Sequence, residues 1–182
     1  TPIRLCIMPQ ERTQPPLASV GDLVRELLRQ PDASAYGAIL ARYAFPSQDL
    51  APYLRWNNRH YTRTCVVRNA RFELLVICYE AEQRTSIHDY DSEAAWIRTL
   101  MGEVVEERFQ PDREGGIRLK QASRLATGEV ASLSRDNSIH RFMNPGPARA
   151  ITLNLYVPPM SQWRVYDERT GAAELRDAGP PR

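Results

Sequence analysis

The chain has few of the residues that usually form disulfides or bind metals. Its 182 residues include three cysteines, Cys6, Cys65 and Cys78, and three histidines. The cysteines lie far apart and none belongs to a Cys-x-x-Cys pair, which excludes a disulfide-rich scaffold and disfavours a structural zinc site. This cysteine usage is typical of a reducing compartment, so we expect a cytoplasmic protein.

Long hydrophobic runs and an excess of one charge are absent as well. No apolar run approaches the roughly 18 residues of a membrane span, and the first residues lack the apolar stretch of a signal peptide. Lysine and arginine total 24 against 22 aspartate and glutamate, which gives no basic surface for nucleic acid. We therefore expect neither membrane nor nucleic acid as a partner. A chain of this length suits one compact domain, expected over 1–182.

Two amphipathic segments near the N-terminus predict helices. In VGDLVRELLRQ, which begins at Val20, apolar residues recur at helical spacing and mark one face. SAYGAILARYAF, at 34–45, repeats the pattern and stops before Pro46. A further helical turn is expected near 47–54. The region from about 20 to 54 should therefore contain two or three helices.

From about residue 62 the sequence changes to short apolar runs separated by glycine and proline. Such spacing is typical of a mostly β domain, either a sandwich or a closed barrel, rather than of alternating strands and helices. We expect the barrel to extend from about 62 to 171. The final segment RDAGPPR, at 176–182, is expected to be disordered.

One predicted strand alternates strictly between apolar and polar residues. In AITLNLYVP, which begins at Ala150, Ile151, Leu153 and Leu155 alternate with threonine, asparagine and Tyr156. A strand places these two sets on opposite faces, and the aliphatic face must meet a core. The pattern alone favours solvent for the polar face. A position inside a barrel would instead make Tyr156 a candidate site residue.

Several segments follow one another in the order of a known family. They are Tyr-Thr-Arg at 61–63, Ile-His-Asp-Tyr at 87–90, Gly-x-x-x-Glu at 102–106, Ile-His-Arg-Phe-Met-Asn at 139–144 and Leu-Tyr-Val-Pro-Pro at 155–159. Over about 20–171 the chain resembles the cysteine dioxygenase family of small cupins. The resemblance implies a mostly β cupin, or jelly-roll, barrel preceded by the N-terminal helices.

The resemblance also implies a chemistry, in which a mononuclear non-haem metal binds a thiol and dioxygen oxidises its sulfur to a sulfinate. His88 and His140 fall on two of the family's three metal-binding histidines, whereas Tyr90 occupies the position of the other. The expected metal is Fe(II), and Ni(II) is the alternative because nickel binds nitrogen and oxygen ligands more tightly. Dioxygen is the expected co-substrate.

The same resemblance assigns the substrate-binding residues. Arg63 falls on the arginine that binds the substrate carboxylate, since a guanidinium offers two parallel donors, and Tyr61 lies beside it. Tyr156 falls on the active-site tyrosine and is expected to contact substrate and to take part in catalysis. The chain departs from the family next to this tyrosine. Asn154 replaces the histidine of a relay, and Ala95 stands where some members carry a cysteine cross-linked to the tyrosine.

Tyr90 leaves three interpretations of the metal site open. Its phenolate can be the third ligand, because residues i and i+2 of a strand point to the same side and a bound cation favours the ionised phenol. Alternatively, Tyr90 swings out, and water, substrate or an acid such as Asp91 or Glu93 completes the site, while Asp89 faces the opposite side. A degenerate cupin without metal is the third interpretation.

Together these features predict a metal-dependent oxygenase that acts on L-cysteine or a similar carboxylate-bearing thiol. The altered ligands suggest a non-standard product, such as a sulfonamide or sulfonate unit, in specialised metabolism. A non-catalytic cupin sensor that binds metal or carboxylate is the alternative, and an isomerase or hydrolase is a third reading.

The expected partner is a small thiol, and the chain is expected to be a monomer or weak homo-oligomer. His60 is interpreted as a surface residue and Arg164 as part of a hairpin.

Overall fold

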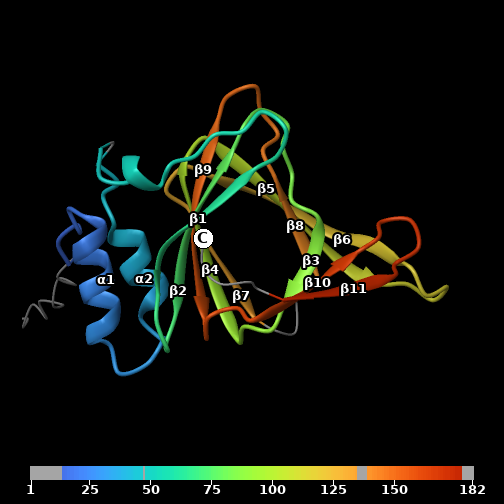
Figure 1. Ribbon diagram of the computed structural model, residues 1–182, viewed down its shortest axis with the longest axis horizontal. Coiled ribbons are helices and arrows are strands. Elements are labelled where there is room, and N and C mark those ends of the chain that lie inside the picture. The colour runs from blue at the N-terminus through green and yellow to red at the C-terminus, as the bar shows by residue number, and fades with distance from the viewer. Residues whose placement is uncertain (1–13, 47, 135–138, 178–182) are drawn as a thin grey trace, which may run out of the picture.

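Two sheets and two helices make up the computed structural model, which describes residues 14–46, 48–134 and 139–177. The helices lie against one side of the β structure, and two hairpins project on the opposite side (Figure 1). The expected mostly β architecture is therefore confirmed.

The N-terminal helices match the expected number. Helix α1 spans Val20–Arg29, α2 spans Tyr36–Arg42, and a short 3₁₀ turn, η1, spans Ala51–Tyr53. The second helix is shorter than the predicted segment 34–45. Ser19 caps α1, because its hydroxyl accepts a hydrogen bond from the backbone N–H of Asp22 at 3.0 Å. None of the helices in the described ranges has the length and apolar character needed to cross a membrane.

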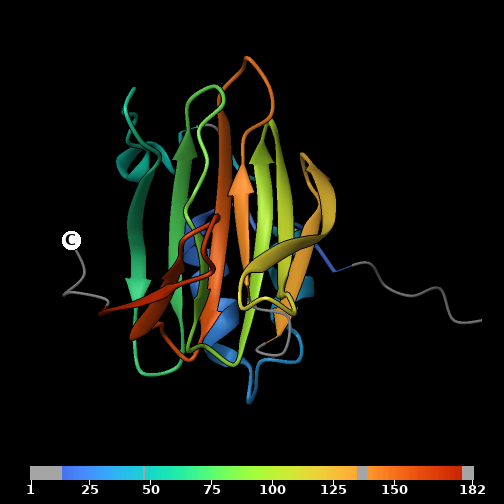
Figure 2. The same cartoon turned by 90° about the vertical axis from the view of Figure 1, so that its right-hand side faces the viewer.

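The strands form one sheet of five and one of six, and the paired strands run antiparallel. They lie side by side when the molecule is turned by 90° (Figure 2). The five-stranded sheet has the order β1 (Thr62–Arg68), β2 (Glu73–Tyr79), β9 (Ala150–Val157), β4 (Ala94–Met101) and β7 (Val130–Ser134). The six-stranded sheet has the order β11 (Ala173–Asp177), β10 (Gln162–Tyr166), β3 (Ile87–Tyr90), β8 (His140–Met143), β5 (Glu103–Pro111) and β6 (Ile117–Ala126).

The larger hydrophobic cluster lies between the helices and the five-stranded sheet. Leu27 of α1, Leu40 of α2 and Leu153 of β9 belong to it and are each 0% exposed. Arg71, in the turn between β1 and β2, also ties α1 to the sheet, since its Nη1 donates to the carbonyl of Leu28 at 2.9 Å. The aliphatic face of β9 therefore meets a core, as its alternation predicts.

The polar face of β9 points into the interior rather than to solvent, which corrects the preference drawn from the pattern alone. Thr152, Asn154 and Tyr156 are 0%, 1% and 5% exposed. A second hydrophobic cluster, to which Ile77 and Phe142 belong, joins residues of both sheets on this side. Alternation distinguishes two faces of a strand, but it does not reveal a second sheet that covers the polar one.

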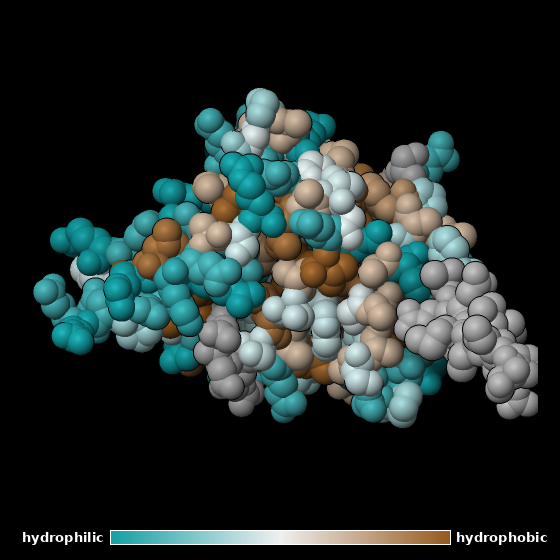
Figure 3. All heavy atoms as spheres, turned by 180° about the vertical axis from the view of Figure 1, so that it is seen from behind, coloured by the Kyte–Doolittle hydropathy of each residue, from teal (hydrophilic) through white to brown (hydrophobic). Residues whose placement is uncertain are grey.

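The β10–β11 hairpin extends the barrel beyond its expected end at residue 171. Arg176 and Asp177 belong to β11 and pair with β10, so the expected disorder of 176–182 is wrong at these two positions. Residues 178–182 lie outside the described part of the chain. The ends of the two projecting hairpins form a hydrophilic part of the surface (Figure 3).

The turn of the β10–β11 hairpin meets the turn of the β5–β6 hairpin at two glycines. A Cβ on Gly171 would lie 2.6 Å from the Cα of Gly116, so no side chain fits there. Gly171 also has a φ of +70°, which favours glycine. This close approach packs the turn of the β10–β11 hairpin against the turn of the β5–β6 hairpin.

Replacing Leu153 by alanine should destabilise the protein by about 2–5 kcal/mol, because it leaves a cavity between the helices and the sheet. Chemical denaturation measures the change in the free energy of unfolding. Leu119→Ala is the matched control, since Leu119 is 52% exposed on β6, and it should cost less than about 0.5 kcal/mol. Equal effects of the two substitutions would contradict the packing described here.

Candidate functional site

The two predicted metal-binding histidines face each other inside the barrel. His88 lies on β3 and His140 on β8, and the two residues are direct partners in the antiparallel register. Cross-strand partners project to the same side of a sheet. The Nε2 atoms of the two rings are 3.3 Å apart, and the ring centroids are 4.7 Å apart. Residues far apart in the sequence thus converge on one point.

The contacts of the other two ring nitrogens assign the tautomers in which both Nε2 atoms carry lone pairs. The Nδ1 of His88 lies 2.9 Å from the carbonyl oxygen of Ser86, and the Nδ1 of His140 lies 3.2 Å from Oε1 of Glu106. Both oxygens accept hydrogen bonds, so these contacts assign a hydrogen to the Nδ1 of each ring. Two lone pairs that face each other repel unless a cation lies between them. The separation suits two nitrogen ligands that each lie about 2.0–2.1 Å from one ion.

The ionisation of His88 is also suitable for metal binding. Burial, together with the neighbouring His140, lowers the pKa of His88 to about 3. The ring is therefore neutral at physiological pH and does not have to lose a proton before its nitrogen binds a metal.

Glu106 contacts the histidine pair, although the sequence analysis gave it no role. It lies on β5, is 2% exposed, and its carboxylate pairs with Arg108 at 3.0 Å as well as with His140. Burial alone would raise the pKa of Glu106, but the hydrogen bonds from His140 and Arg108 outweigh it and lower the pKa. An ionised Glu106 fixes the tautomer and orientation of His140. The Gly-x-x-x-Glu segment beginning at Gly102 was the available signal.

Tyr90 lies beside the two histidines and has an unsatisfied hydroxyl. Its ring centroid is 5.5 Å from that of His140, 6.1 Å from that of His88 and 5.1 Å from that of Tyr156. The side chain is buried, and its oxygen has no hydrogen-bond partner among the described residues. Burial, with contributions from Tyr156 and Glu106, raises the pKa of Tyr90 well above its ordinary value. A buried phenol without a partner is costly, so this oxygen is available to a group bound beside the histidines.

The acids next to Tyr90 are engaged elsewhere. Asp89 faces the opposite side of β3, where its carboxylate accepts hydrogen bonds from Arg164 at 2.6 Å and from the hydroxyl of Tyr166 at 2.8 Å. Arg164 is thus more than a hairpin residue, since it holds β10 against β3. Asp91 accepts a hydrogen bond from the backbone N–H of Ser161 at 3.0 Å.

These residues fit a mononuclear metal with two imidazole ligands. Within the described ranges, no group of three or more histidine, cysteine, aspartate and glutamate side chains is placed to hold an ion. Tyr90 supplies a buried, unpartnered oxygen next to the two imidazoles. The side chains that fit a metal are therefore His88, His140 and Tyr90, and Glu106 accepts a hydrogen bond from His140.

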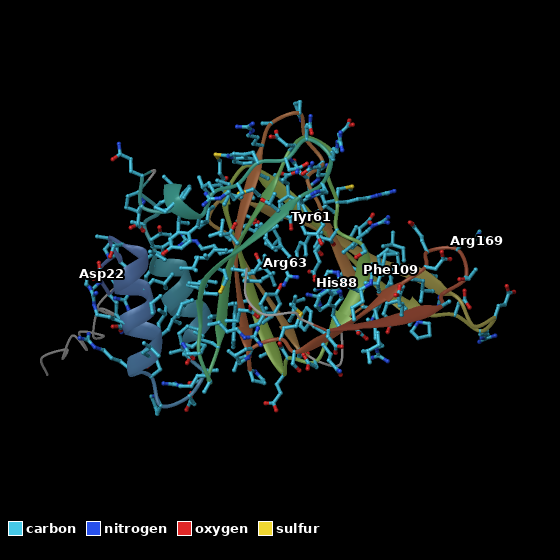
Figure 4. All side chains as sticks on the ribbon, viewed as in Figure 1. Asp22, Tyr61, Arg63, His88, Phe109 and Arg169 are labelled. Carbon is cyan, nitrogen blue, oxygen red and sulfur yellow. The ribbon has the colours of Figure 1, made fainter. Side chains whose placement is uncertain are left out.

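A small cavity of about 110 Å³ opens beside His88. Tyr61, Arg63 and His88 lie together in the space between the two sheets (Figure 4). Tyr156 also lines the cavity, and its hydroxyl oxygen accepts a hydrogen bond from Nδ2 of Asn154 at 3.3 Å. The cavity wall consists of Tyr61, Arg63, Ile77, Tyr79, Thr85, Ser86, His88, Phe142, Asn154, Tyr156, Met160, Trp163 and Arg176.

Three of the other lining residues lie close to the predicted ones or come from an unexpected strand. Tyr79 stacks on Tyr61 with ring centroids 5.9 Å apart. Trp163 lies under the guanidinium of Arg63, at 5.8 Å from Cζ to the ring centroid. Arg176 comes from β11, where the sequence analysis expected disorder. His60 does not line the cavity and is exposed, in agreement with its interpretation as a surface residue.

The chain matches the family model for cysteine dioxygenase type I over residues 9–169. Among similar proteins, cysteine dioxygenase type 1 of Danio rerio is 29% identical over 138 residues, covering 73% of this chain and 69% of that protein. The protein of the same name from Homo sapiens is also 29% identical over 138 residues, covering 74% of this chain and 69% of its own length.

Solved structures with a similar fold include the protein TT1209 from Thermus thermophilus, with a TM-score of 0.51 and 22% identity, covering 61% of this chain and 95% of that one. Another is a conserved protein with a double-stranded β-helix domain from Klebsiella pneumoniae, with a TM-score of 0.52 and 16% identity. The match covers 70% of this chain and 94% of that one. These likenesses concern the fold alone, and they confirm the expected cupin barrel. The family match confirms the resemblance drawn from the sequence motifs: the chain belongs to the cysteine dioxygenase type I family, whose members are thiol dioxygenases with a mononuclear non-haem metal.

Proposed function

We propose that this chain oxidises the sulfur of L-cysteine or of a similar carboxylate-bearing thiol. The supporting observation is that the Nε2 atoms of His88 and His140 face each other at 3.3 Å beside a small cavity that Arg63 also lines. One of the two facing histidines and a cation for a carboxylate therefore border one space, which suits a thiol that also carries a carboxylate. We place the enzyme in the cytoplasm because of its cysteine usage.

His88, His140 and Tyr90 are the proposed metal ligands, with Tyr90 bound as phenolate. The unpartnered hydroxyl of Tyr90 supports this assignment, and iron accepts tyrosinate ligands in catalases. A bound Fe(II), or Ni(II) in its place, would supply a binding position for the thiolate and the electron transfer that dioxygen chemistry needs. Two imidazoles and one phenolate carry a single negative charge, like the two-histidine, one-carboxylate site of other non-haem iron enzymes.

Arg63 is proposed to bind and orient the substrate carboxylate. Within the described residues it forms no ion pair, and the ring of Trp163 lies 5.8 Å from its Cζ. The planar guanidinium offers two parallel N–H donors, which fit the two oxygens of a carboxylate. Tyr61, stacked on Tyr79, lies in the same wall and limits how the substrate can turn.

Tyr156 is proposed to hold a proton at the reacting end of the cavity. Burial raises the pKa of Tyr156, although Arg63 and Asn154 lower it in part, so the phenol stays protonated. Asn154 donates its amide hydrogen to the phenol oxygen, which leaves the hydroxyl hydrogen free for a group in the cavity. An amide cannot pass protons onward as an imidazole does, so Asn154 orients Tyr156 without relaying its proton.

The product and the oligomeric state stay proposals. We propose that the changed residues at positions 90 and 154 direct the sulfur to a non-standard product, such as a sulfonamide or sulfonate unit. A cupin sensor that binds metal or carboxylate without turnover is the alternative, and the experiments below distinguish the two. The partner is a small thiol, and the chain acts as a monomer or weak homo-oligomer.

Substitution of either facing histidine should abolish metal binding. His88→Gln and His140→Gln should each reduce the metal content of purified protein from about one ion per chain to a tenth or less, measured by elemental analysis. Glu106→Gln should weaken metal affinity by about 10–100-fold, because His140 loses the carboxylate that fixes its orientation. His60→Gln is the matched control and should keep its metal. Full occupancy in both His88→Gln and His140→Gln would refute the site.

Tyr90→Phe tests the phenolate ligand directly. Aerobic, iron-loaded wild-type protein should be coloured, since ferric tyrosinate absorbs visible light by charge transfer, and Tyr90→Phe should lose this band while it retains iron. Visible absorption together with elemental analysis measures both properties. Tyr36→Phe is the control, because Tyr36 is equally buried but belongs to the cluster between the helices and the five-stranded sheet. A colourless wild type with ferric iron bound would exclude Tyr90 from coordination.

Thiol oxidation is tested with L-cysteine under oxygen-18 gas, with protein loaded separately with Fe(II) and Ni(II). Mass spectrometry should show labelled oxygen on the sulfur of the product. Arg63→Gln should lower kcat/KM for the carboxylate thiol by about tenfold or more, because a charge-assisted hydrogen bond is lost, and should reduce the preference over cysteamine. The control is Arg59→Gln, since Arg59 is exposed and lies four positions before Arg63. This variant should keep the wild-type kcat/KM and the wild-type preference over cysteamine.

Unchanged thiols with every metal would reject the oxygenase. If metal or a carboxylate still binds tightly under those conditions, the sensor alternative is supported instead.

A further inference from the structure

Arg176 is a second basic residue in the cavity wall, and the proposed reaction does not involve it. It lies on β11 and is the cross-strand partner of Trp163 on β10. Both residues line the cavity. Arg63 approaches the same indole from β1, which belongs to the other sheet. The two arginines therefore reach one small cavity from opposite sheets.

The strand register shows that Arg176 belongs to the inner face of its sheet. Trp163 is paired with Tyr90 on β3 and with Arg176 on β11. Cross-strand partners share a face, so these three side chains form a row that looks into the barrel. Neighbouring strands are about 4.8 Å apart, which puts the Cα of Arg176 roughly 10 Å from that of Tyr90. Arg176 thus lies at the open end of the row, with its side chain 50% exposed.

The charges around the cavity are unbalanced. Among the described residues that line it are two arginines, but no aspartate or glutamate. Within the described chain, the ion pair of Arg176 is with Glu174, at 3.1 Å, and the two side chains are 50% and 70% exposed. A pair this exposed is screened by water and contributes little, so a bound anion can replace it. The guanidinium of Arg176 is therefore available to a ligand.

We propose that the preferred substrate is a small thiol with two acidic groups, the first bound by Arg63 and the second by Arg176. This inference rests on the proposed thiol oxidation and narrows its substrate class. The cavity of about 110 Å³ limits the ligand to a small metabolite. With Arg176 at the open end of the row, the second acidic group lies at the mouth of the cavity and the sulfur lies at its inner end.

The competing arrangement has both arginines on one carboxylate. In that case a second acidic group would gain nothing, and it would bring an unpaired charge into the cavity. A comparison of two thiols that differ by one carboxylate separates the two arrangements. Mercaptosuccinate and 2-mercaptopropionate are such a pair, because mercaptosuccinate carries one additional carboxylate on the carbon next to the one that bears the sulfur.

Steady-state oxygen uptake and calorimetric titration with both thiols test the proposal on the metal-loaded full chain. Wild-type protein should bind mercaptosuccinate about tenfold more tightly than 2-mercaptopropionate, with the difference in KM rather than in kcat, as expected for one added charge-assisted contact. The ratio of the affinities for the two thiols should fall to about one in Arg176→Gln. In Arg176→Lys this ratio should be partly restored.

Arg169→Gln is the matched control, because Arg169 lies at the far tip of the same hairpin, away from the cavity (Figure 4). This variant should keep the wild-type ratio. A circular dichroism spectrum and a thermal melt of each variant show whether the hairpin is still folded.

The outcomes separate the two proposals. A ratio near one in the wild type, or the same ratio in wild type and Arg176→Gln, overturns the inference. Absence of oxygen uptake with either thiol rejects the proposed oxidation, but the calorimetric ratio still decides whether the cavity selects two acidic groups. A ratio that falls equally in Arg169→Gln would mean that long-range charge, not contact with Arg176, determines the preference, and this too overturns the inference.

Discussion

The face-to-face approach of two imidazoles is the constraint on which the rest of the site depends. His88 and His140 are direct partners on antiparallel strands, and their Nδ1 atoms are engaged by Ser86 and Glu106. In the tautomers that these contacts assign, the Nε2 lone pairs meet across 3.3 Å, an arrangement that a cation stabilises. A register shift by one residue would send one ring to the outer face. Pairing of β8 with β5, where Arg108 lies opposite His140, helps to fix that register.

The charge near the proposed metal differs from that of a site with three histidines. A divalent ion with three neutral imidazoles keeps a charge of two, whereas one with two imidazoles and the proposed phenolate of Tyr90 keeps a charge of one. The carboxylate of Glu106, hydrogen-bonded to His140, makes that ligand more basic as well. Both changes stabilise the ferric state and weaken the attraction for an anionic thiolate. An added attraction for the substrate is therefore useful away from the metal, and the two cavity arginines can supply it.

The sequence predicted the parts of this site that depend on local geometry. The i, i+2 spacing of His88 and Tyr90 placed them on one side of a strand, and the mostly β fold followed from short apolar runs punctuated by glycine and proline. Features that depend on which elements meet were missed. The polar face of β9 was assigned to solvent because its pattern does not reveal the second sheet. Glu106 was left without a role because its contact with His140 joins residues 34 positions apart. Arg176 was assigned to a disordered tail because polar residues, glycine and prolines follow no strand pattern.

Strand β3 links the metal ligands to the cavity wall through its two faces. His88 and Tyr90 point inward, while Asp89 between them points outward and binds Arg164 and Tyr166 of β10. Because side chains alternate along a strand, an Arg164 that faces outward obliges Trp163 to face inward. The cross-strand partner of Trp163, which is Arg176, then faces inward as well. The buried Asp89 therefore positions the proposed substrate-binding surface, although it does not line the cavity or contact the histidine pair. The orientation of the second arginine is thus coupled to the strand that carries two of the proposed ligands, so metal site and substrate selectivity share one structural support.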